Sequence, residues 1–319
     1  MSAGPAGHVM RSFDIPNSET ALGALSAPPA TPLRRFLRTD DGVNIETVYD
    51  PKAVVYNASD DTGTPPSGHL PDRPVGRPAD RSPARLAVVV AHGFTGHADR
   101  PHVRRVAGAL ARYGSVVTFS FRGHGRSGGH STVGDREVLD LAVAVRWARE
   151  LGHEHIATVG FSMGGSVVLR HAARPDAGTD AVVSVSAPAR WYYRGTAPMR
   201  RVHWLITRPE GRLVGRYGFR TRIHHRDWDP VPLSPVESVP LIAPTPLLMV
   251  HGDQDGYFPV DHPETLAAAA GDHGELWLER GMGHAENAAS GELLERIGEW
   301  VEKRVPRYGH GFPTTPAAP

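Results

Sequence analysis

A serine flanked by glycines, between a strand-like run and a helix-like run, constrains the fold of this chain more than any other feature. Residues 156–159 read Ile-Ala-Thr-Val, residues 160–165 read Gly-Phe-Ser-Met-Gly-Gly, and residues 166–173 are predominantly apolar and helix-like. A β-carbon would clash in so sharp a turn, so glycine is needed two positions either side of the serine. Gly160 and Gly164 meet that need around Ser162. The pattern predicts a nucleophile elbow, which raises the Ser162 hydroxyl above the edge of a sheet.

The rest of the chain offers the partners that such a serine requires. A serine hydroxyl becomes nucleophilic when a base takes its proton, and a third group must orient that base. His284 follows a strand-like segment and a glycine-rich turn, and we predict it as the base. A buried strand is predicted at residues 246–250, and the loop after it contains Asp253 and Asp255. The chain order of serine, aspartate and histidine is that of α/β-hydrolases and differs from the orders in chymotrypsin and subtilisin.

With these motifs, the sequence resembles the α/β-hydrolase superfamily, in particular its monoacylglycerol lipase and serine aminopeptidase-like branch, over about residues 33–305. Four segments carry the resemblance: residues 92–94 (His-Gly-Phe), residues 122–127 (Arg-Gly-His-Gly-Arg-Ser), the Ser162 elbow, and the loops with Asp255 and His284. In such families the acid lies three residues after the glycine of an H-G-x-x-D-x-x-x-P loop. The resemblance therefore implies Asp255 as the acid, and Asp253 is interpreted as a turn or capping carboxylate.

The resemblance also implies the oxyanion hole. In relatives the residue after the His-Gly pair donates its backbone N–H, which implies Phe94, together with the N–H of Met163. One position departs from the pattern, because Ser120 stands where relatives usually have an aspartate, two residues before Arg122. A serine accepts fewer hydrogen bonds, so the rigidity of the loop at 122–129 is left open. His124 belongs to the same loop signature, and we predict a structural hydrogen-bonding role for it.

Alternating strand and helix patterns predict an α/β fold: a mainly parallel sheet with helices on both faces, as in the α/β-hydrolase fold. We expect the hydrolase core at residues 32–188 and 241–305, interrupted by a small cap insertion at 189–240. Residues 1–31 are predicted to be a disordered N-terminal tail and residues 306–319 a flexible C-terminal tail. A long surface loop is predicted at about residues 57–84.

Composition excludes several classes of partner and cofactor. Lys and Arg number 35 against 34 Asp and Glu, so the charge does not favour nucleic acid as a partner. The chain has no cysteine, the histidine pairs lack metal-ligand spacing, and no nucleotide-binding glycine motif follows a strand, so we expect neither a metal nor a cofactor. Without a signal peptide or a membrane-length apolar run, we expect no integral membrane segment and a cytoplasmic protein. The oligomeric state stays open.

The predicted cap is rich in arginine and aromatic residues. Residues 189–240 contain ten arginines against four acidic residues. This charge has two interpretations: it attracts an anionic substrate or lipid surface, or it is a solvated helix face that acids elsewhere balance. The aromatic side chains pack the cap onto the body or roof an apolar acyl pocket. The arginines are Arg190, Arg194, Arg200, Arg201, Arg208, Arg212, Arg216, Arg220, Arg222 and Arg226.

These patterns predict a cofactor-free serine hydrolase that cleaves a carboxylic ester of a small-molecule acyl substrate. It would use Ser162, His284 and Asp255 and pass through an acyl-enzyme. The same residues could act on a thioester, on a peptide with a free amino end, or on a carbon–carbon bond. An alternative of another class is a non-catalytic binding or signalling protein with the hydrolase fold, since fold does not fix function.

Overall fold

The computed structural model describes residues 31–52 and 85–305. The tails predicted at 1–31 and 306–319 lie outside these ranges, except for residue 31. The surface loop predicted at 57–84 also lies outside the described residues.

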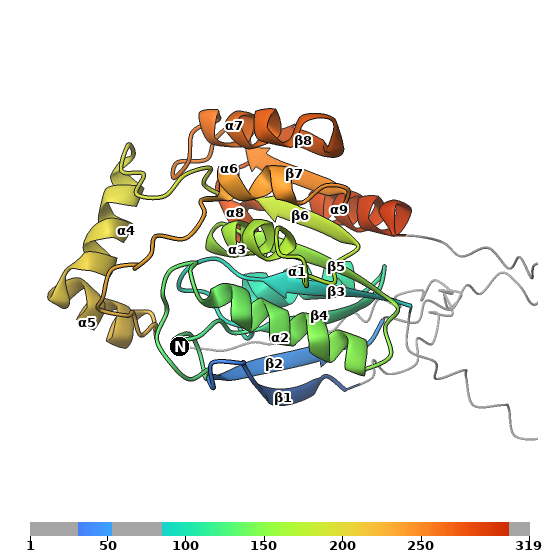
Figure 1. The fold of residues 1–319 in the computed structure, drawn as a ribbon, viewed down its shortest axis with the longest axis horizontal. Helices are drawn as coiled ribbons and strands as arrows, with labels where there is room; N and C mark the ends of the chain where they lie inside the picture. The colour runs from blue at the N-terminus through green and yellow to red at the C-terminus, as the bar shows by residue number, and fades with distance from the viewer. Residues whose placement is uncertain (1–30, 53–84, 306–319) are drawn as a thin grey trace, which may run out of the picture.

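One sheet of eight strands, in the order β1-β2-β4-β3-β5-β6-β7-β8, forms the centre of the fold (Figure 1). The pairs β1·β2 and β2·β4 are antiparallel, and every other neighbouring pair is parallel. The predicted mainly parallel sheet is therefore confirmed. The strands are β1 (Leu33–Arg38), β2 (Asn44–Asp50), β3 (Leu86–Ala91), β4 (Ser115–Phe119), β5 (His155–Phe161), β6 (Ala181–Val185), β7 (Leu247–Gly252) and β8 (Gly274–Glu279).

Helices cover both faces of the sheet, which explains why β3 is apolar at every position. Ala87 and Val89 belong to a core that includes apolar residues of α2, α3 and α7, whereas Val88 and Val90 belong to a second core with α1 and α9. Successive side chains of a strand point to opposite faces, so each strand contributes to both cores. These helices are α1 (Pro101–Leu110), α2 (Glu137–Glu150), α3 (Met163–Ala172), α7 (Asp261–Ala270) and α9 (Gly291–Arg304), with the short α8 (Ala285–Ala288) and 3₁₀ turn η2 (Gly271–His273).

The segment predicted as a cap, residues 189–240, contains two helices outside these layers. They are α4 (Ala197–Thr207) and α5 (Pro209–Gly218), and Figure 1 shows them in yellow, beyond the carboxyl ends of the strands. Thr196 begins α4 by accepting a hydrogen bond from the Met199 N–H, and Arg208 separates the two helices. The short α6 (Pro235–Ser238) and η1 (Val239–Leu241) return the chain to the body, where Val239 is part of the core.

The turn from β5 into α3 brings the backbone at the start of α3 into close contact with the backbone of β3 and β5. Ser162 has φ 52° and ψ −113°, a conformation that costs free energy for a residue with a side chain. A β-carbon at Gly164 would lie 2.2 Å from the carbonyl oxygen of Ala91 in β3, and one at Gly160 would lie 2.2 Å from the Gly164 oxygen. The two glycines therefore allow α3 to begin directly against the sheet, as the sequence pattern predicts.

We expect Gly164→Ala to destabilise the fold strongly, because the methyl group meets backbone that belongs to the central strand and cannot move aside. Gly108→Ala is the matched control, since Gly108 lies inside α1 with nothing within 4 Å of its added β-carbon. The control should stabilise the protein by about 0.5–1 kcal/mol. Urea unfolding of both variants tests the prediction, and equal stability of the two would contradict it.

Candidate active site

Ser162 lies between the end of β5 and the first turn of α3, and its side chain meets His284. The Ser162 Oγ is 2.9 Å from the His284 Nε2. His284 follows β8 through the turn at residues 280–283 and directly precedes α8. The two residues are 122 positions apart in the chain, and the parallel order of β5, β6, β7 and β8 brings them to the same end of the sheet.

Asp255 holds the other side of the His284 ring. Its Oδ2 is 2.8 Å from the His284 Nδ1, while its Oδ1 accepts hydrogen bonds from the N–H groups of Tyr257 and Phe258 at 2.8 and 3.1 Å. Burial raises the pKa of Asp255, but the hydrogen bond and charge of His284 and these two N–H groups outweigh it and keep the pKa below its ordinary value. Asp255 is therefore an ionised acceptor that fixes the His284 ring with Nδ1 as the donor.

Asp253 does not contact His284. It is exposed, and its Oδ1 accepts a hydrogen bond of 2.6 Å from the Gly281 N–H. The bond ties the loop after β7 to the turn before His284. Of the two candidate aspartates, the structure brings only Asp255 to the histidine.

The two predicted oxyanion donors flank Ser162. Met163 is the first residue of α3, where a backbone N–H has no acceptor within the helix. Among the described residues, no acceptor takes a hydrogen bond from the Phe94 N–H. Both residues line the same pocket as Ser162. The two N–H groups are thus available to an oxygen bound beside the serine.

Glu286 is a site residue that the sequence analysis missed. Its carboxylate is buried, and Oε1 accepts a hydrogen bond of 2.9 Å from the Gly93 N–H, one residue before Phe94. The same oxygen lies 3.8 Å from the His102 Nε2. The position of Glu286, two residues after the predicted base, was the one signal in the sequence that could have pointed to it. Its partner Gly93 is 193 positions away, and no local pattern links the two residues.

His124 has the structural role predicted for it. Its Nε2 accepts a hydrogen bond from the Thr95 N–H at 3.3 Å, and its Nδ1 lies 3.0 Å from the Arg122 carbonyl oxygen. Burial lowers the pKa of His124 to about 4, so the ring is neutral at pH 7. The neutral ring bridges the loop after β3 to the loop after β4.

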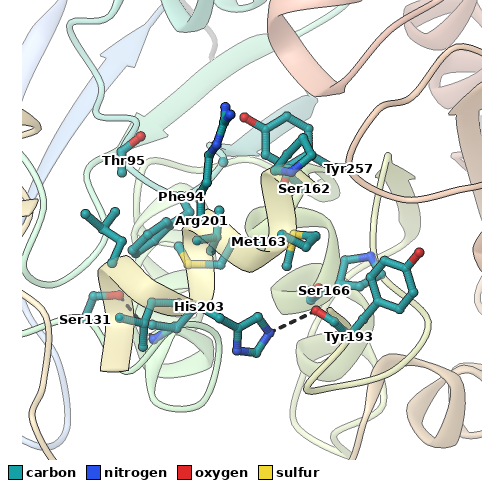
Figure 2. Close-up of a pocket in the computed structure, with 18 of the residues that line it drawn as sticks. Phe94, Thr95, Ser131, Ser162, Met163, Ser166, Tyr193, Arg201, His203 and Tyr257 are labelled. Carbon is teal, nitrogen blue, oxygen red and sulfur yellow. Dashed lines mark hydrogen bonds between the residues drawn. The ribbon is translucent and has the colours of Figure 1, made fainter. Parts of the chain in front are cut away.

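A pocket of about 810 Å³ opens above Ser162 and His284. Figure 2 shows its lining around Ser162, with Met163 and Tyr257 beside the serine. The ring of Tyr257 stacks on His284, with the ring centres 4.2 Å apart. Apolar side chains from the body and from residues 189–240 face each other across this pocket; they include Phe94, Met163, Met199, Leu205, Ile206 and Phe219.

Residues 31–52 and 85–305 hold neither a cluster of metal-ligating side chains nor a membrane-spanning helix. No three His, Asp or Glu side chains come together there as ligands of a metal ion would. None of the helices in these ranges has the length and apolar character needed to cross a bilayer.

Comparison with known proteins identifies the family. The sequence model of the alpha/beta hydrolase fold matches residues 87–201. A monoacylglycerol lipase of Mycolicibacterium smegmatis is 30% identical over 213 residues, which cover 55% of this chain and 72% of that protein. The chain belongs to the α/β-hydrolase superfamily.

Solved structures agree with this α/β-hydrolase assignment at the level of the fold. The esterase Pf2001 of Pyrococcus furiosus superposes with a TM-score of 0.62 at 21% identity, over 86% of this chain and 94% of that one. The α/β-hydrolase GrgF of Penicillium sp. sh18 superposes with a TM-score of 0.61 at 18% identity, over 86% and 99% of the two chains. The family model and the lipase relative confirm the superfamily resemblance and the hydrolase class predicted from the sequence, and these structures confirm the fold class.

Buried neutral histidines of this α/β-hydrolase should make its stability depend on pH. Burial lowers the pKa values of His124, His171 and His262 to about 4 each, against about 6.5 in an unfolded chain. Between these values the unfolded state binds more protons, so the free energy of unfolding should fall as the pH falls from 6.5 towards 4.

Urea unfolding at several pH values between 7.5 and 5 measures this effect before most carboxylates titrate. His171→Leu should make the slope shallower, because it removes one ring that binds a proton in the unfolded state and stays neutral in the folded state. A free energy of unfolding that stays constant from pH 6.5 to 5 would contradict the assignment of these rings as neutral.

Proposed function

We propose that this α/β-hydrolase cleaves carboxylic esters, with Ser162 as nucleophile, His284 as base and Asp255 as the acid that orients it. The observation that carries the proposal is the hydrogen-bonded series from Ser162 through His284 to Asp255, opening on a pocket of about 810 Å³. A buried carboxylate, an oriented imidazole and an accessible hydroxyl together form an activated nucleophile.

In the first half of the reaction, the His284 Nε2 takes the proton of Ser162 as the serine oxygen attacks the ester carbonyl carbon. Asp255 stabilises the imidazolium that forms. The Phe94 and Met163 N–H groups donate to the oxyanion, and the amino end of α3 adds a favourable dipole. When the carbon–oxygen bond of the ester breaks, His284 returns the proton to the departing alcohol, which leaves an acyl group on Ser162.

In the second half, water attacks the acyl group while His284 takes one of its protons. The bond between the acyl carbon and the serine oxygen then breaks, and the proton passes back to Ser162. The products are an alcohol and a carboxylic acid, and no step needs a metal or a redox cofactor.

Glu286 is proposed to position the oxyanion hole. By accepting the Gly93 N–H, its carboxylate would hold the 93–94 peptide so that the Phe94 N–H faces the pocket. A donor that is fixed in advance stabilises the transition state without a cost of reorganisation during the reaction.

The relative named a monoacylglycerol lipase and the structural neighbours named esterases support an acyl ester as the substrate class. The apolar pocket supports a substrate with an acyl chain. Helices α4 and α5 would act as the cap that selects it. A cytoplasmic location stays a prediction from the sequence.

Labelling by a fluorophosphonate, followed by a panel of 4-nitrophenyl esters from acetyl to decanoyl, tests the proposal. We expect covalent labelling at Ser162 and turnover of at least one ester. If the protein is labelled but turns over only thioesters, aminoacyl amides or substrates with a scissile carbon–carbon bond, the same residues act on that bond and not on an ester. No labelling and no turnover would favour a non-catalytic binding protein.

Replacement of individual site residues tests the roles of the two aspartates. Ser162→Ala should abolish turnover and labelling while leaving thermal unfolding nearly unchanged. Asp255→Asn should lower kcat by roughly 10⁴-fold, as expected when a triad loses its carboxylate. Asp253→Asn is the matched control and should cost much less, because among the described residues the hydrogen bond of the Asp253 carboxylate comes from the Gly281 N–H and not from His284. If the Asp253 variant were the inactive one, the proposed acid would be wrong.

Glu286→Ala should lower kcat about 10-fold or more with little change in KM, because the substrate still binds while the oxyanion donor loses its support. Glu286→Gln keeps an oxygen that can accept the Gly93 N–H and should restore most of kcat. Steady-state kinetics on a neutral ester distinguish the two variants. If the alanine variant kept full activity, Glu286 would not position the oxyanion hole. If both variants lost the same activity, the loss would come from the missing negative charge and not from the missing hydrogen-bond acceptor.

A further inference from the structure

Arginines from several separate segments line the pocket above Ser162. They are Arg100 just before α1, Arg190 and Arg194 between β6 and α4, Arg201 on α4, and Arg226 after α5. The pocket-lining carboxylates are Asp227 and Glu286. Glu286 is buried and already accepts the Gly93 N–H, so it offers little to the arginines.

Most of these arginines have no carboxylate partner. Within residues 31–52 and 85–305, Arg190 pairs with Asp261 at 2.7 Å, whereas no acidic group lies within ion-pair distance of Arg100, Arg194, Arg201 or Arg226. Among the cap arginines of the pocket, balancing by an acid elsewhere in the described residues therefore applies to Arg190 and not to Arg194, Arg201 or Arg226, whose charges are exposed to solvent.

The unpaired charges act on groups inside the pocket. Desolvation lowers the pKa of His203, and the charge of Arg194 lowers it further. The pKa of His102 is likewise lowered by desolvation and by the charges of Arg100 and Arg105, which outweigh the opposing effect of Glu286. The charges of Arg194 and Arg100 thus disfavour a proton on these two pocket histidines, in addition to the effect of desolvation.

Arg201 is the most direct candidate to meet a substrate. Its side chain extends from α4 (Figure 2) and lines the pocket together with Tyr257, whose ring stacks on His284. A guanidinium group presents paired N–H donors that match a carboxylate or phosphate. Arg201 therefore places its charge on the side of the pocket that residues 189–240 form.

We propose that the pocket selects esters that carry a second, anionic oxygen group, a carboxylate or a phosphate, which the unpaired pocket arginines bind while the ester carbonyl lies at Ser162. The inference rests on the proposed ester hydrolysis and adds the charge of the substrate to it. The apolar side chains of the pocket would hold the hydrocarbon between the two ends.

The test compares substrates that share an acyl ester and differ in whether they carry an anionic group. In one arm, the mono-4-nitrophenyl ester of suberic acid is compared with its methyl ester, and 4-nitrophenolate release is followed. In the other arm, a lysophosphatidic acid is compared, below its critical micelle concentration, with the monoacylglycerol of the same acyl chain, and fatty acid release is followed. A preference for the anionic member of the first pair identifies a carboxylate as the second group of the substrate, and a preference in the second pair identifies a phosphate.

We expect kcat/KM to be about 10-fold higher for the anionic member of at least one pair at low salt, because each ion pair at a partly exposed site contributes modestly and several act together. Added salt should reduce that ratio and leave the neutral substrate almost unaffected. Arg201→Gln should lower the ratio at least about threefold, and the double variant Arg194→Gln/Arg201→Gln should nearly abolish it.

Arg208→Gln is the matched control. Arg208 lies between α4 and α5 with the same charge but does not line the pocket, so its variant should keep the full ratio. Thermal unfolding checks that each variant is folded. Equal kcat/KM within both pairs, or a preference that survives the double variant and high salt, would overturn the inference. If neither neutral nor anionic esters were turned over and Ser162 were not labelled, the proposed function itself would fail.

Discussion

The contact between the start of α3 and the backbone of β3 is the constraint on which the site depends. Gly164 allows that contact, and the Ser162 N–H donates to the Val185 carbonyl oxygen of β6 at 2.8 Å. Together they hold Ser162 at φ 52°, a conformation the isolated residue would avoid. The strain is offset by packing across three central strands, and the result is a hydroxyl at a fixed height above the sheet.

The serine, the acid and the base could be predicted because each follows a strand in a local pattern. Parallel strands end at the same edge, so residues after β5, β7 and β8 must meet there. The choice of Asp255 over Asp253 came from a family spacing and not from physical reasoning. In the structure the difference is clear, since Asp255 is buried against His284 whereas Asp253 is exposed against Gly281.

Contacts between distant residues that no local motif marks could not be predicted. Glu286 meets Gly93 across the active site, and Glu46 of β2 accepts a hydrogen bond of 3.0 Å from the Ser120 hydroxyl at the position where relatives usually have an aspartate. The Ser120 hydroxyl in turn accepts the Ala98 N–H at 3.1 Å. A serine directly after β4 and a glutamate of β2 thus tie down the start of the loop whose rigidity the sequence left open. Neither residue carries a local pattern that indicates its partner.

The distribution of charge in the site has a consequence for turnover. Asp255 and Glu286 are both buried, and an oxyanion would add a third negative charge close to them while only His284 becomes positive. A substrate anion beside the oxyanion would add to this negative charge and oppose the reaction. Binding of an anionic substrate by the unpaired pocket arginines is therefore most favourable where the anion lies towards the mouth of the pocket, away from Phe94 and Met163.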